Sequence, residues 1–247
     1  MKQSEINTRD YWEERFSSGD WEKYGGGEQS AFFSKIAIDA FPAWLKRELS
    51  QNAWNVADWG CAEGSGTAVL ARRFPACRFV GIDFSPAAVE EAEKKYPYCN
   101  FRTGDVLGEI ECTDVIFCSN VLEHMKEPLS IMEKLAAGAK QHAIFLVPLH
   151  DQSDISEHFY IFDEAFFPVR FQRHILSYFQ IIDCSRMNSP YWKDKQLLLV
   201  YSEEEAYKKI AHTLSDLFSN AEYDQLKIQL DRTEAELISE RARLSAL

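Results

Sequence analysis

Short apolar runs rich in β-branched and aromatic residues recur along the middle of the chain, with amphipathic stretches between them. Such runs, bounded by turn-forming residues, are typical of buried strands. Alternation of strands with helices predicts an α/β sheet of parallel strands with helices on both faces. The five predicted strands cover residues 54–59, 77–83, 98–105, 113–120 and 142–148.

Three helices are predicted between these strands, at Ser65–Phe74, Pro86–Tyr96 and Leu129–Ala137. The second has a clear start, because the side chain of Ser85 can cap the helix and proline suits the first helical position. Gly138 marks the expected end of the third helix.

The pattern changes after the fifth strand. A helical stretch is expected near Asp163–His174, followed by two apolar runs at 176–183 and 195–202. The turn-rich segment RMNSPYWKD joins these runs and predicts a hairpin. The complete sheet would therefore have seven strands, with an antiparallel hairpin at one edge.

Two flanking regions differ from this α/β core at 51–202. Residues 1–50 are predicted to form a helical cap, with YGGGEQS as a flexible break. The cap is rich in aromatic residues, which are expected to pack against the protein more readily than to form a ligand cage. They are Tyr11, Trp12, Phe16, Trp21 and Tyr24.

The last region, 203–247, is charged and predicted to be helical. From Tyr223 to Leu247 the apolar positions follow a 3-4-3-4 spacing, which is the heptad period of a coiled coil. We expect this helix to pair with a second copy of the chain or to continue into a larger protein. The alternative is a last helix that lies back on the domain.

Composition and charge narrow the class of protein. The chain has 247 residues, of which 46% are hydrophobic, enough for a substantial core. Its formal net charge of −12 and lack of a Lys/Arg run argue against a protein that binds the nucleic-acid backbone. The start has no apolar signal region, and the longest smooth apolar run, AIFLV, is too short to span a membrane.

The six cysteines form no C-x-x-C pair, and several sit inside apolar runs. This usage is typical of small buried side chains in a reducing compartment. The expected location is therefore the cytoplasm.

The segment VADWGCAEGSGTAVL, residues 56–70, has the form of a strand that turns into a helix over a nucleotide. A dinucleotide fingerprint, G-x-G-x-x-G, fits only in part, because Val69 stands at its third glycine position. A second pattern, acid-x-Gly-x-small-x-Gly, fits better and consists of Asp58, Gly60, Ala62 and Gly64.

Acidic residues also end the next two predicted strands. Asp83 follows the second strand, where a carboxylate can accept hydrogen bonds from both ribose hydroxyls, although dinucleotide enzymes place an acid there too. Asp105 ends the third strand and could accept from an adenine amino group, with the Val106 N–H beside it. The segment CSNVLEHMKEP directly follows the fourth strand.

Together these segments resemble the class I S-adenosylmethionine-dependent methyltransferases. VADWGCAEGSG, VGIDFSPAAVEEAEKKYP, FRTGDV and DVIFCSNVLEHMKEPLSIMEKL are similar to four family motifs, in order and each at a strand end. The resemblance covers roughly residues 53–202. It implies a Rossmann-like, seven-stranded sheet whose last strands form an antiparallel hairpin, and S-adenosylmethionine as the cofactor.

The resemblance also implies roles for single residues. Gly60 and the Cys61 backbone would approach the methionine moiety, while Asp58 either contributes there or ties the turn together. Asp83 would hold the ribose. The full set implied to bind the cofactor is Asp58, Gly60, Cys61, Ala62, Gly64, Asp83, Phe84, Asp105, Val106, Asn120 and Leu122.

The segment after the fifth strand is PLHDQSDISEHFYIFD, and within it His158 followed by FYIFD resembles the family's stretch over the acceptor pocket. A histidine there can take the proton of an acceptor hydroxyl. His158 is the first candidate for this base, ahead of His124 and then His150; the Glu123-His124 pair could instead order its loop. The same segment mixes histidines with carboxylates, but it lacks a metal-loop signature, so no metal site is expected.

The acceptor is the least defined part of the prediction. The segment DYWEERFSSGDWEKYGGGEQSAFF is similar to the lead segments of bacterial methyltransferases in cell-surface polysaccharide synthesis. This resemblance implies O-methylation of a sugar in a surface glycan of the O-antigen type, or in its precursor. The alternatives are a small-metabolite or quinone-precursor methyltransferase, a catalytically idle scaffold and, more distantly, an aminopropyltransferase-like enzyme.

Overall fold

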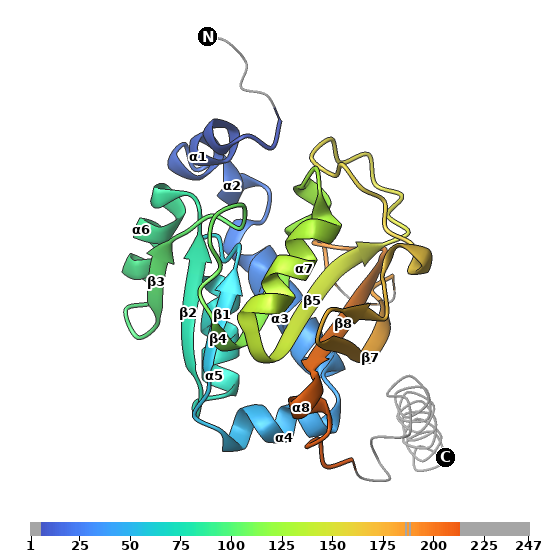
Figure 1. Cartoon of the computed structure of the whole chain (residues 1–247). Helices are drawn as coiled ribbons and strands as arrows, with labels where there is room; N and C mark the ends of the chain where they lie inside the picture. Colours follow the sequence, from blue (N-terminus) through green and yellow to red (C-terminus); the bar gives the residue numbers. More distant parts are fainter. Residues whose placement is uncertain (1–5, 186, 188, 213–247) are drawn as a thin grey trace, which may run out of the picture.

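A computed structural model describes residues 6–185, 187 and 189–212 (Figure 1). Eight strands form one sheet in the order β3-β2-β1-β4-β5-β8-β7-β6. Strands β1 to β5 pair in parallel, and β8, β7 and β6 add antiparallel pairs at one edge. The strands are β1 Asn55–Trp59, β2 Arg78–Asp83, β3 Asn100–Thr103, β4 Thr113–Ser119, β5 Ala139–Leu149, β6 Arg170–Phe171, β7 His174–Asp183 and β8 Lys195–Glu203.

Helices cover both faces of this sheet, as the alternating pattern predicts. Helix α7 lies on one face, and α3 and α5 lie on the other, while α1 and α2 sit above the carboxyl ends of the parallel strands (Figure 1). The helices are α1 Arg9–Ser17, α2 Asp20–Lys23, α3 Gly26–Ala40, α4 Ala43–Gln51, α5 Ser65–Arg73, α6 Pro86–Lys95, α7 Pro128–Gly138 and α8 Glu204–Tyr207. The described residues also contain two 3₁₀ turns, η1 Leu122–His124 and η2 Glu164–Phe166.

The sheet and its antiparallel last hairpin are confirmed, with one more strand than the predicted seven. The additional strand is the two-residue β6 at the edge. Ser85 caps α6 as expected, since its hydroxyl accepts from the Ala88 amide at 3.1 Å.

The helix predicted near Asp163–His174 is wrong. Only the short turn η2 forms there, followed by β6 and the start of β7. Pro168 explains the interruption, because proline has no amide hydrogen to donate and drives the residue before it into extended backbone. Phe167 has φ −95° and ψ 119°, as this restriction requires.

The flexible break predicted at YGGGEQS is also wrong, because α3 begins within it at Gly26. A Cβ placed on Gly27 would lie 2.4 Å from the Ser65 hydroxyl oxygen, and one on Gly66 would lie 2.6 Å from that of Ser34. These glycines therefore allow α3 and α5 to approach closely.

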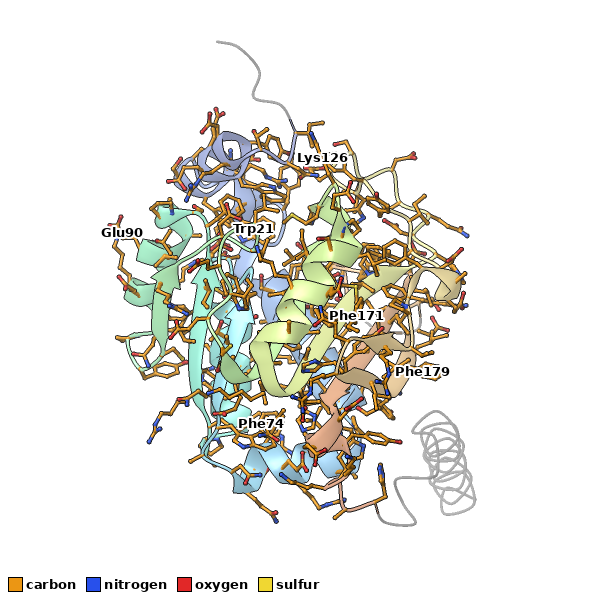
Figure 2. The ribbon with its side chains drawn as sticks, in the orientation of Figure 1. Trp21, Phe74, Glu90, Lys126, Phe171 and Phe179 are labelled. Atoms are coloured by element: carbon orange, nitrogen blue, oxygen red, sulfur yellow. The ribbon has the colours of Figure 1, made fainter. Side chains whose placement is uncertain are left out.

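The core has two main parts, one on each face of the sheet. On the α3 and α5 face, Phe41 stacks on Phe74 and meets Phe117 edge-on, and all three are fully buried. Burying such a side chain contributes about 2–3 kcal/mol. Phe74 lies at the end of the sheet far from Trp21, while Phe179 projects from the outer hairpin (Figure 2).

Beyond β8 the described chain continues through α8 to residue 212. The coiled coil predicted from Tyr223 to Leu247 lies outside the described residues. Within the part of the chain that the structure describes, no helix combines the length and apolar character needed to cross a membrane.

Candidate active site

The turn after β1 is built from residues in the left-handed region of backbone conformation. Gly60, Ala62 and Gly64 have φ of 79°, 48° and 81°. Alanine adopts this conformation only at a cost of about 1–2 kcal/mol, so the turn is strained at Ala62. The amides of Gly60 and Cys61 both donate to the Ile82 carbonyl oxygen, at 2.8 and 3.2 Å, which joins the turn to β2.

Gly64 ends the same turn at the start of α5. It caps α5, and a Cβ on it would lie 2.6 Å from the Phe101 ring. Gly60, Cys61 and Ala62 line a cavity above the sheet, whereas Gly64 does not.

Asp58 ties the strand to the helix that follows. Its carboxylate accepts a 2.6 Å hydrogen bond from the Thr67 hydroxyl on α5, and the residue is only 4% exposed. Burial is the main reason that its pKa rises to about 7. The residue lines the cavity, and its contact with a cofactor stays a prediction.

This shift gives an expected pH dependence. An aspartate in the unfolded chain has a pKa of about 4. Between about pH 4 and about pH 7 the folded protein therefore binds more protons than the unfolded chain, and its free energy of unfolding falls as pH rises. Asp58→Asn keeps an oxygen for Thr67 and removes the titration. Between about pH 5.5 and about pH 8, the free energy of unfolding of wild type should fall by about 2 kcal/mol more than that of this variant.

Chemical denaturation of both proteins without cofactor measures the difference, with the exposed Asp10→Asn as the matched control. An equal pH dependence in wild type and Asp58→Asn would show that Asp58 does not titrate in this range.

Asp83 lies at the end of β2, where the sequence predicts it. Its two oxygens accept from the amides of Ala62 and Ser85, each at 2.9 Å. Burial raises its pKa to about 6. The residue does not line the cavity in this structure. Because an ionised carboxylate offers about four acceptor positions, its predicted contact with ribose hydroxyls remains compatible with these bonds.

Helix α1 crosses the region next to Asp83. The Arg9 guanidinium donates to the Phe84 carbonyl oxygen at 3.0 Å, and the Ser85 hydroxyl donates to the Glu13 carboxylate at 2.5 Å. Helix α1 therefore contacts the predicted ribose-binding edge directly.

The remaining predicted cofactor residues separate into two groups. Asn120 lines the cavity and has φ 53°. Its side-chain oxygen accepts a 3.1 Å hydrogen bond from the side-chain amide of Gln196. Phe84, Asp105, Val106 and Leu122 do not line the cavity. The Asp105 carboxylate accepts from the Leu107 amide at 2.9 Å, while the side chains of Val106 and Leu122 are buried in the core.

The cavity itself measures about 560 Å³. It lies between α1 and α2, the carboxyl ends of β1 and β4, and the segment after β5. Among its described lining residues, Arg15 is the one lysine or arginine. Five acidic residues share the lining: Asp20, Asp58, Glu123, Asp154 and Glu157.

The aromatic residues of the cap pack around the chain's own arginine. The Arg15 guanidinium lies 5.2–5.8 Å from the ring centres of Tyr11, Trp12, Trp21 and Tyr24. It also forms a 2.7 Å ion pair with Glu157, whose side chain is 17% exposed. This pairing neutralises the one cationic side chain of the described cavity wall.

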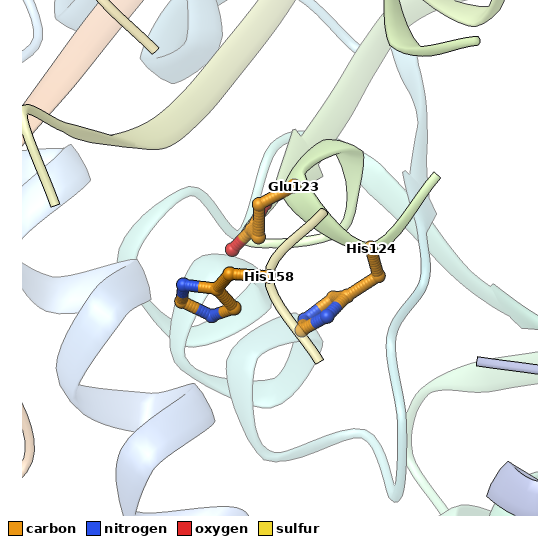
Figure 3. A group of neighbouring side chains, drawn as sticks. All are labelled: Glu123, His124 and His158. Carbon is orange, nitrogen blue, oxygen red and sulfur yellow. The ribbon is translucent and has the colours of Figure 1, made fainter. Parts of the chain in front are cut away.

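Two histidines face the cavity from different segments. The Nδ1 atom of His158 lies 2.5 Å from the Asp151 carboxylate, and Nδ1 of His124 lies 2.9 Å from the Glu157 carbonyl oxygen. Their ring centres are 5.1 Å apart (Figure 3). Burial lowers the pKa of His124 to about 4, so this imidazole is neutral at physiological pH.

His150, the third candidate base, is placed elsewhere. It has φ 51°, does not line the cavity and lies 2.9 Å from Glu164 on the surface. The structure therefore favours His158 and His124 over His150 as groups near an acceptor.

Sequence reasoning missed two parts of the site. Arg15 meets Glu157 only in the folded chain, and no motif marks it. Glu63 accepts a 2.5 Å hydrogen bond from the Trp21 indole and so joins α2 to the turn after β1. Glu63 lies within the motif VADWGCAEGSG, and this position could have marked it as part of the site. The sequence does not show that Trp21 is its partner.

Known proteins match this arrangement. The family described as "Methyltransferase domain" matches residues 50–215. Trans-aconitate 2-methyltransferase of Escherichia coli O7:K1 is 33% identical over 109 residues, and the match spans 43% of this chain and 43% of that protein. The corresponding enzyme of Shigella flexneri is 32% identical over the same length.

Solved structures show the same fold at low identity. Magnesium protoporphyrin IX methyltransferase from Synechocystis PCC 6803 with bound SAH has a TM-score of 0.58 at 18% identity, covering 79% of this chain and 97% of that one. A Haloferax volcanii putative methyltransferase, solved with its Trm112 activator, has a TM-score of 0.59 at 16% identity, covering 79% and 99%.

The chain belongs to the methyltransferase domain family. The relatives named above are methyltransferases, and the Synechocystis enzyme has also been solved with bound S-adenosylmethionine, which is therefore the cofactor to test against this site. The residues present fit the cofactor, since the turn at Gly60–Ala62 presents its backbone to a cavity whose volume lies within the usual range for small-molecule sites.

Proposed function

We propose that this methyltransferase transfers a methyl group to a hydroxyl oxygen of an uncharged, polyhydroxylated acceptor, such as a sugar of a surface glycan or its precursor. The observation that carries the proposal is the excess of acidic side chains on the cavity wall. Their oxygens accept hydrogen bonds from hydroxyls, and an anionic acceptor brought against Asp20, Asp154 and Glu157 would be repelled. Asp58 and Glu123 add hydrogen-bonding groups more than charge, because burial raises their pKa values to about 7 and about 8.

The Arg15–Glu157 pair strengthens this choice of acceptor. An anionic acceptor would need a cation to bind, but Arg15 already faces Glu157 at 2.7 Å and Asp20 at 3.5 Å. The aromatic rings of Trp12 and Trp192 add flat apolar surface to the same cavity.

A second candidate is a small carboxylic acid, favoured by the similarity to trans-aconitate 2-methyltransferase. Trans-aconitate is a tricarboxylate, which suits the acidic wall poorly. The match also spans less than half of that relative, so its acceptor does not transfer directly to this chain.

The residues of the site can serve the reaction in a simple way. S-adenosylmethionine, when bound, supplies a methyl group activated by the positive charge on sulfur. The backbone of Gly60, Cys61 and Ala62 would hold its methionine end. An acceptor oxygen would take this methyl group as the carbon–sulfur bond breaks, and the electron pair of that bond would stay on sulfur. The hydroxyl proton would pass to Nε2 of His158, whose Nδ1 atom faces the Asp151 carboxylate.

The test is a transfer assay with methyl-labelled cofactor over two sets of acceptors. One set contains neutral glycans and oligosaccharides, and the other contains trans-aconitate and related polycarboxylates. We expect labelled methyl ethers in the first set and little label in the second. Efficient transfer to polycarboxylates, with none to neutral hydroxyl acceptors, would overturn the proposal.

A further inference from the structure

Glu123, His124 and His158 come together on one side of the cavity (Figure 3). The first two lie on the 3₁₀ turn η1 after β4, and the third lies on the segment after β5. One ligand atom from each side chain lies within 4.8 Å of the ligand atoms of the other two. Two imidazoles and a carboxylate at such separations form the donor set of many metal sites.

The hydrogen bonds behind the two histidines set their tautomers. A carboxylate and a carbonyl oxygen can only accept, so the Nδ1 atoms of His158 and His124 must donate to Asp151 and to the Glu157 carbonyl. Each neutral imidazole then keeps its lone pair on Nε2. Metal-binding histidines are oriented by this same kind of outer carboxylate or carbonyl partner.

Asp151 is itself held in place for this task. Its other carboxylate oxygen accepts from the Ser153 amide at 2.8 Å, and the residue is only 4% exposed. The arrangement from Ser153 through Asp151 to His158 is therefore fixed before any ligand arrives.

Glu123 supplies an independent observation. The residue is 1% exposed, and its Oε2 atom has no hydrogen-bond partner in the described structure. A buried carboxylate oxygen without a partner is costly. In Figure 3 the carboxylate points toward the side on which His158 lies. A cation between them would satisfy this oxygen.

We propose that Glu123, His124 and His158 bind a divalent first-row transition metal ion, such as Mn²⁺, Fe²⁺, Co²⁺ or Zn²⁺. Two imidazoles favour these ions over Mg²⁺ and Ca²⁺, which prefer oxygen ligands. Three protein ligands leave coordination positions for water and for an acceptor hydroxyl. The last point rests on the proposed function, whereas metal binding does not.

The site would refine the role of His158. A hydroxyl bound to the cation becomes more acidic, and its proton passes to water at the open positions. His158 then acts as a metal ligand and not as the base itself. If it binds an ion, this site would replace the expectation that the chain binds no metal, which considered the segment at 150–158 without Glu123.

The alternative is that the three side chains only pack together. Trp12 contacts His124 edge-on at 5.2 Å, so the histidines also belong to an aromatic cluster. Packing alone predicts no affinity for a cation, and the two cases differ in a direct binding measurement.

The experiment titrates the full chain with Co²⁺, free of S-adenosylmethionine and acceptor, and follows the visible absorption of the bound ion and the heat of binding. Wild type should bind one Co²⁺ per chain and take up Mg²⁺ far more weakly. Glu123→Gln and His124→Ala should each weaken Co²⁺ binding at least about ten-fold, and Asp151→Asn should weaken it about 10–100-fold through His158.

His212→Ala is the matched control, because this histidine is exposed, lies next to Trp44 and does not line the cavity. It should bind Co²⁺ as wild type does. Circular dichroism and S-adenosylmethionine affinity establish that each variant is folded, and the use of two ligand variants protects the test if one of them is not.

No binding of Co²⁺, Mn²⁺ or Zn²⁺ by the folded wild type would overturn the proposal. So would equal Co²⁺ affinity in wild type, Glu123→Gln and His124→Ala. Because the readout involves neither acceptor nor methyl transfer, failure of the metal site leaves the proposed function standing, and failure to methylate sugars leaves the metal site standing.

Discussion

Replacing His158 with alanine is expected to lower the turnover number for methyl transfer about a hundred-fold, the usual cost of losing the group that manages proton transfer. The affinity for S-adenosylmethionine should change little, because His158 belongs to the segment after β5 and not to the turn at Gly60–Ala62 that is proposed to hold the cofactor. Initial rates at saturating cofactor and calorimetric titration measure the two quantities separately.

His150→Ala is the matched control for this variant. His150 belongs to the same segment but pairs with Glu164 outside the cavity, so its loss should leave the rate unchanged. Full activity in both His158→Ala and His124→Ala would show that neither imidazole takes part in the transfer.

Asp83→Ala should weaken the binding of S-adenosylmethionine ten-fold or more. A carboxylate that accepts from ribose hydroxyls contributes charge-assisted hydrogen bonds, which are about twice as strong as neutral ones. The structure adds a second reason, since this carboxylate also holds the amide of Ala62 in the turn that lines the cavity. Calorimetry with S-adenosylmethionine or its demethylated product measures the loss.

Asp83→Asn separates the two contributions. Asparagine keeps an oxygen that can accept from the Ala62 amide but removes the charge, so this variant should lose less affinity than Asp83→Ala. Thermal unfolding records any loss of stability in both. Unchanged cofactor affinity in Asp83→Ala would refute the assignment of Asp83 to the ribose.

The parallel strands and their connecting helices could be predicted because their signals are local. The apolar run 113–120 contains β4, and the cap formed by Ser85 needs only residues within one helical turn. The glycines at 25–27 predicted a flexible break, but helix α3 begins among them. The small size of Gly27 serves the contact between α3 and α5, and the sequence does not reveal that partner.

The turn after β1 was predictable for the same reason, because its glycines and Asp58 lie within a few positions of one another. The acceptor side was not. Arg15 and Glu157 are 142 positions apart, and His158 meets Glu123 only because the segment after β5 folds over η1. Such contacts depend on tertiary structure, and no spacing in the chain encodes them.

The most direct test of the central claim is a crystal structure of the protein with S-adenosylhomocysteine. We predict that its amino-acid end lies against the backbone of Gly60, Cys61 and Ala62, that its ribose hydroxyls contact Asp83, and that its sulfur faces the cavity containing His158. A product molecule bound away from this turn, or with its ribose remote from Asp83, would contradict the assignment of the active site.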